Sequence, residues 1–159
     1  MRRPLSPALL ALLLLLCGCA ALAAAQKPAY GAVLRGKNQN PPVTTKATGF
    51  FKLKFSSAKK PPRTATWTLS LARFTGLTLT MGHIHVGAAG VNGPVVFTLF
   101  TGGVGGFGSK VSSVLLTETL PFSNSTISDV ATLLANKTAL YVNIHTVENP
   151  TGIIRGQLK

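Results

Sequence analysis

Two stretches of the chain alternate strictly between apolar and polar residues, and this pattern constrains the fold more than any other feature. Apolar residues occupy positions 51, 53 and 55, and again positions 65, 67, 69 and 71, while lysine, threonine and serine fill most of the positions between them. Successive side chains of a β-strand point to opposite faces, so each stretch predicts a strand with one buried face. We expect Trp67, Leu69 and Leu71 to lie in the core.

Similar short runs, separated by glycine, proline and asparagine, predict further strands along the chain. The expected strands are 30–35, 50–55, 64–71, 78–86, 95–100, 111–116, 140–146 and 153–158. About eight short strands with this spacing predict an all-β fold, either a β-sandwich or a Greek-key barrel. One segment departs from the pattern, because Ile127, Val130, Leu133 and Leu134 recur at helical spacing. A short helix is therefore expected at about 128–136, with Thr126 and Asp129 as a capping box.

The first 25 residues resemble a signal peptide. Arg2 and Arg3 precede an apolar run of about eight residues, which is too short to cross a bilayer, and alanines follow at 23–25. We expect 1–25 to be removed and 26–159 to form one secreted β domain, with no transmembrane segment. Cys17-Gly18-Cys19 also resembles a lipobox, so a bacterial host would give a periplasmic or lipid-anchored protein. Because no cysteine lies beyond position 19, no disulfide is expected in the mature domain.

The chain is strongly basic, with a formal net charge of +13. Positions 27 to 110 hold eleven lysines and arginines and no acid, whereas the three acids lie in the last quarter, where they balance Lys137, Arg155 and Lys159. Such a field attracts polyanions. For a secreted or cell-wall protein, we expect an acidic polysaccharide or another extracellular polyanion rather than nucleic acid. The expected contact surface is one hairpin and its tip, which carry Lys52, Lys54, Lys59, Lys60 and Arg63.

The three histidines of the chain have an ordered spacing. His83 and His85 lie two residues apart, so their rings share one face of a strand, and Met81 precedes them on that face. If the strand carrying His145 is a neighbour, three imidazoles and a thioether converge, a ligand set suited to copper or zinc. The alternative interpretation is structural, with each ring donating to a backbone carbonyl. Copper and zinc are therefore possible cofactors, and no other cofactor is indicated.

Catalytic chemistry has little support in the sequence. Only Glu118, Asp129 and Glu148 could serve as carboxylate acids or bases, and no nucleophile-elbow motif is present. We therefore expect a binding protein rather than an enzyme. Asn124 and Asn136 each begin an Asn-X-Ser/Thr sequon and would carry glycans in a eukaryotic host.

Three sequence blocks together resemble the CHRD domain, which takes its name from chordin. They are NPPVTT at 40–45, HIHVGAAGVNGPVV at 83–96, and YVNIHT at 141–146 followed by GIIRGQL at 152–158. The resemblance spans residues 30 to 159 and implies a secreted or surface β domain with no established catalytic activity. In one respect this chain departs from the pattern, because Ile153 stands where the family usually has an acid. The resemblance thus implies a binding module and weakens the case for an acid-assisted cation site.

Overall fold

The computed structural model describes residues 29–56, 64–102, 112–121, 124–136 and 138–159. Its elements are β1 (Ala29–Arg35), η1 (Gly36–Asn38), β2 (Thr48–Ser56), β3 (Thr64–Ala72), β4 (Leu79–Val86), β5 (Val95–Phe100), β6 (Ser113–Pro121), α2 (Ser125–Ala135), β7 (Leu140–Thr146) and β8 (Ile154–Gln157). The eight strands form one sheet in the order β5-β4-β7-β8-β1-β2-β3-β6. Every neighbouring pair is antiparallel. The prediction of an all-β fold with one short helix is confirmed.

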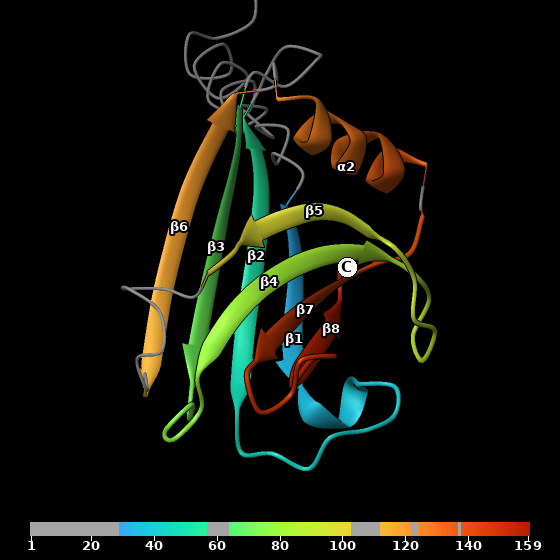
Figure 1. Cartoon of the computed structure of the whole chain (residues 1–159). Helices are drawn as coiled ribbons and strands as arrows, with labels where there is room; N and C mark the ends of the chain where they lie inside the picture. The colour runs from blue at the N-terminus through green and yellow to red at the C-terminus, as the bar shows by residue number, and fades with distance from the viewer. Residues whose placement is uncertain (1–28, 57–63, 103–111, 122–123, 137) are drawn as a thin grey trace, which may run out of the picture.

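The sheet curls into a half-barrel whose inner face holds the core (Figure 1). The β2–β3 hairpin illustrates how alternation fills it. Cross-strand partners Phe51 and Leu69, and Leu53 and Trp67, are all buried, while the residues between them point to the outer face. Burying such apolar side chains contributes about 1.5–3 kcal/mol each. Trp67 is therefore buried in a strand, as predicted.

Helix α2 lies beside the edge strand β5 (Figure 1) and buries Ile127 and Val130 completely. The prediction of its start at about 128 was wrong. The side-chain oxygen of Asn124 accepts hydrogen bonds from the Ile127 backbone N–H and the Thr126 hydroxyl, so the helix begins at Ser125. Asparagine is among the strongest N-cap residues, which explains why it, and not the proposed capping box, sets the boundary.

Within the described residues, no helix is long and apolar enough to cross a membrane. Residues 1–28, which include the predicted signal peptide, lie outside the described part of the chain. The cleavage prediction and the alternative of a lipid-anchored Cys19 remain predictions.

Candidate metal centre

The outer face of the half-barrel carries a layer of polar side chains where β4, β7 and β8 lie side by side. Strand β7 is buried on both faces, because Val142 and Ile144 lie in the core whereas Asn143 and His145 lie in the outer layer. Chain segments from other parts of the fold cover this layer. Gln39 donates to the Asn143 side chain, which donates in turn to the Thr151 carbonyl. A sheet face that would normally meet water is thereby enclosed.

The three histidines converge in this layer. In the β4–β7 register, His83 lies opposite Asn143, and His85 lies opposite Tyr141. The ring centroids of His83 and His145 are 5.1 Å apart, and those of His83 and His85 are 5.7 Å apart. One nitrogen from each of the three rings lies within 4.8 Å of the other two. The convergence expected from the spacing of His83, His85 and His145 is present.

Backbone carbonyls orient two of the rings. The Nδ1 atom of His85 lies 2.9 Å from the Gly93 carbonyl oxygen, and that of His145 lies 2.9 Å from the Pro150 carbonyl oxygen. A carbonyl only accepts, so both Nδ1 atoms carry the proton and both Nε2 atoms present a lone pair. Metal-binding histidines are commonly held through their second nitrogen in this way.

The Nε2 lone pairs of His145 and His85 have different surroundings. His145 Nε2 lies 3.2 Å from His83 Nδ1, which must donate to it in the neutral cluster. The Nε2 atom of His85 is buried and has no hydrogen-bond partner among the described residues. An unpaired buried acceptor costs about 1–3 kcal/mol. The cluster therefore contains an unused ligand atom.

All three imidazoles are held in the neutral form that metals require. The pKa of His83 is lowered to about 4, mainly by burial and further by the neighbouring His145 and His85. Burial is also the main cause that lowers the pKa of His85 and of His145, although the carbonyl bond to each opposes the effect. At neutral pH, the cluster offers lone pairs rather than positive charge.

Met81 was predicted to join the histidines. It lies opposite His145 in the β4–β7 register, and directly opposed residues project from the same face of a sheet. Its side chain is partly exposed. Met81 thus occupies a position on the same face of the sheet as the imidazoles, and its side chain meets solvent.

Arg155 is the residue that sequence reasoning missed. Its side chain is 1% exposed, and its guanidinium lies 3.4 Å from the Tyr141 ring centroid. It donates to the carbonyls of Ala88 and Val91 and to the side chains of Asn92 and Gln157. Its partners among the described residues are thus carbonyl and amide oxygens. Tyr141, Asn143 and His145 alternate with apolar residues along the sequence. This pattern indicates a polar layer on one face of the sheet, in which a buried cation such as Arg155 could find partners.

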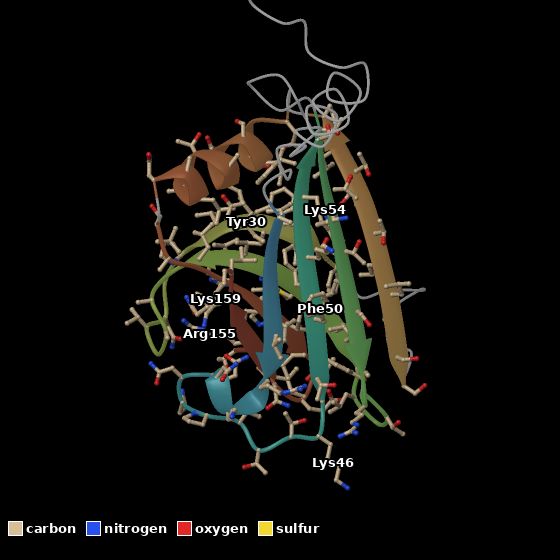
Figure 2. All side chains as sticks on the ribbon, turned by 180° about the vertical axis from the view of Figure 1, so that it is seen from behind. Tyr30, Lys46, Phe50, Lys54, Arg155 and Lys159 are labelled. Carbon is tan, nitrogen blue, oxygen red and sulfur yellow. The ribbon has the colours of Figure 1, made fainter. Side chains whose placement is uncertain are left out.

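The remaining predicted residues lie elsewhere. Lys52 and Lys54 are exposed on the outer face of β2, and Lys54 is labelled in Figure 2. Lys59, Lys60 and Arg63 lie outside the described residues. Asn124 caps α2, and Asn136 is exposed directly after it.

Comparison of the sequence with known protein families gave a match. The CHRD domain family matches residues 30–158, which cover the whole β domain and all three histidines. The chain belongs to the CHRD domain family. No curated protein and no solved structure gave a match. Ile153, at which we expected the family to carry an acid, is buried in the hydrophobic core. Among the described residues, no carboxylate joins the three imidazoles in the cluster.

Proposed function

We propose that this CHRD domain is a secreted, non-catalytic protein that binds one copper ion through His83, His85 and His145. The observation that carries the proposal is the buried, unpaired Nε2 atom of His85 beside two other imidazoles. A bound metal would accept that lone pair and remove the cost of leaving it unpaired. His83 would have to exchange its Nδ1 proton for a lone pair, which is a change of tautomer only.

The geometry supports binding after a small adjustment. Metal–imidazole bonds of about 2.0–2.1 Å bring ligand nitrogens to roughly 3.3–3.5 Å from one another. The widest separation here is bounded by 4.8 Å, so the cluster would contract by at most about 1.5 Å. His83 is the least buried of the three rings and supplies the freedom for that movement.

The charge around the site favours Cu(I) over divalent zinc. Three neutral imidazoles and a thioether leave the charge of the ion uncompensated, and the described cluster includes no carboxylate. The Tyr141 ring stacks on His85 with ring centroids 4.8 Å apart, and the Arg155 guanidinium lies over the same Tyr141 ring. A fixed positive charge therefore lies close to the imidazoles. A monovalent, soft ion is repelled less, and thioether ligands prefer Cu(I).

The test is an anaerobic titration of untagged protein with Cu(I) against a chromophoric chelator, with a parallel Zn(II) titration. We expect one equivalent of Cu(I) to bind, and His85→Gln to lose most of the affinity. Because the chain holds only three histidines, imidazole ¹⁵N NMR spectra contain three ring systems, and all three should shift. Met81→Leu should weaken Cu(I) binding and leave Zn(II) binding unchanged. Failure of both metals to bind would refute the proposal, and a preference for zinc would refute the choice of copper.

A second candidate function has one specific observation in its favour. Lys52 and Lys54 project side by side from the outer face of β2, beside the end of the hairpin at which Lys59, Lys60 and Arg63 occur in the sequence. We propose that this basic face contacts an acidic extracellular polysaccharide. Retention on heparin and polygalacturonate matrices should fall in the Lys52→Ala/Lys54→Ala variant. Lys46→Ala, which removes an exposed lysine from another part of the surface (Figure 2), is the control.

A further inference from the structure

A groove on the outer face of the sheet lies beside the polar layer described above. Its volume is about 740 Å³, within the range of small-ligand sites. Its floor includes Gly31 and Val33 of β1, and Phe50 of β2 stands at one side. Lys37, which follows β1, and Lys159 also line it. In Figure 2, Phe50 and Lys159 lie on opposite sides of β1. We refer to this feature as the outer groove.

The apolar side of the outer groove is an aromatic platform. Phe50 is 50% exposed, although its neighbours Gly49 and Phe51 on the strand are turned to the core. Its ring lies over Gly31, where a Cβ atom would stand only 3.8 Å from Phe50 Cζ. Because Gly31 has no side chain, β1 places no side chain against the Phe50 ring at this position. Aromatic faces carry partial negative charge and attract the C–H edges of a ligand.

Two lysines give the outer groove a positive charge. Lys37 and Lys159 are exposed, and Lys159 is fixed in place by two backbone hydrogen bonds with Gly31 at 2.9 and 3.0 Å. Arg155 adds positive charge beneath the surface, but its donors are occupied by protein oxygens, so direct contacts fall to the lysines. The described residues that line the groove include no acid. A concave site lined by one sign of charge concentrates anions.

We infer that the outer groove binds one ring of a carboxylated sugar, with its C–H face on Phe50 and its carboxylate toward Lys37 and Lys159. A groove lined by one aromatic platform and two lysines matches a uronate, which is apolar on one face and anionic at its edge. A membrane surface is too flat to reach a concave site. Single-stranded nucleic acid uses successive aromatic platforms, and this groove offers one. The inference deepens the second proposed function, since it names the ligand class and places the specific contact in the groove that adjoins Lys52 and Lys54.

The experiment is a titration of the protein with a defined oligogalacturonate at physiological salt, followed by calorimetry and backbone NMR. We expect saturable binding with shifts at Gly31 and Phe50, and no binding of the fully methyl-esterified oligosaccharide. Phe50→Ala should weaken binding about ten-fold, in line with the loss of one stacked ring. The control Leu115→Ala removes a side chain that is 71% exposed on β6, outside the groove, and should leave binding unchanged.

The charge variants separate this inference from the hairpin-face proposal. Lys37→Ala/Lys159→Ala should weaken binding more than Lys46→Ala does. If Lys52→Ala/Lys54→Ala weakens binding while Phe50→Ala matches Leu115→Ala, the outer groove is refuted and the hairpin face is retained. Absence of any binding refutes both. Tighter binding of a sulfated oligosaccharide without carboxylates refutes the uronate assignment.

Discussion

Replacing Gly152 by alanine tests whether the covering segments are held as the structure shows. Gly152 has a φ of +125°, which an L-residue rarely adopts. An added Cβ would also stand against the side-chain amide of Asn143 and 2.6 Å from Gln39 Nε2. These two side chains form the buried hydrogen bond that joins the segment after η1 to β7. The substitution therefore adds backbone strain and displaces a buried contact.

The two effects have different magnitudes, and a second glycine separates them. Positive φ in a non-glycine residue costs about 1–2 kcal/mol. Leaving a buried polar group unsatisfied costs about 1–3 kcal/mol more. Gly152→Ala should therefore lower the free energy of unfolding by roughly 2–5 kcal/mol. Gly76 has a φ of +85° and no heavy atom within 4 Å of an added Cβ, so Gly76→Ala should cost only about 1–2 kcal/mol.

Urea unfolding provides the measurement. Trp67 is the only tryptophan of the chain and is buried, so its fluorescence reports loss of the core. The two variants and the unmodified protein should be compared at constant pH in the absence of metal. If Gly152→Ala lowers the free energy of unfolding no more than Gly76→Ala does, the Asn143–Gln39 contact does not stabilise the covering segments, and these segments do not enclose the polar layer as the structure shows.

Three further predictions concern the site and the helix. In the metal-free protein, the thermal midpoint should decrease as the pH is lowered from 7 to 5, because the lowered pKa of His83 lets the unfolded chain bind a proton before the folded protein does. His83→Gln should reduce this pH dependence, and an unchanged dependence would contradict the prediction. Arg155→Lys should lower the free energy of unfolding in urea by about 2–4 kcal/mol, because an ammonium group can neither stack on the Tyr141 ring nor make the several hydrogen bonds of the planar guanidinium. A loss below about 0.5 kcal/mol would contradict this. Asn124→Ala should lower the free energy of unfolding by about 1 kcal/mol through loss of the N-cap, measured on protein without glycans, and a neutral result would place the cap elsewhere.

The strands were predictable because the signal is local. Strands 95–100 and 140–146 were predicted with the bounds that β5 and β7 have, since alternation within a strand directly records which face is buried. The start of α2 was harder to predict from the sequence. Several residues before it can act as caps, and only the observed hydrogen bonds identify Asn124. Local patterns thus predicted the elements and left their ends uncertain.

The candidate metal centre was predictable only in part. The spacing of His83 and His85 placed two rings on one face, and the polar positions of β7 suggested where His145 would join them. The contacts that orient the rings come from other segments, such as the carbonyls of Gly93 and Pro150. No local pattern encodes which loop will cover a given face. Arg155 was missed for the same reason, since its carbonyl partners lie more than sixty positions away in the sequence.

Among the described residues, the buried cation has no carboxylate partner, and this changes what it does at this site. An arginine paired with an acid would present little net charge, whereas Arg155 is surrounded by carbonyl and amide oxygens and keeps its full charge beside Tyr141. That charge opposes protonation of His85 and also opposes a second positive charge on a bound ion. In the proposed copper site, Arg155 would therefore favour a monovalent over a divalent ion. An Arg155→Met variant that still folds should bind zinc more tightly relative to Cu(I), and an unchanged ratio would show that ligand softness alone sets the preference.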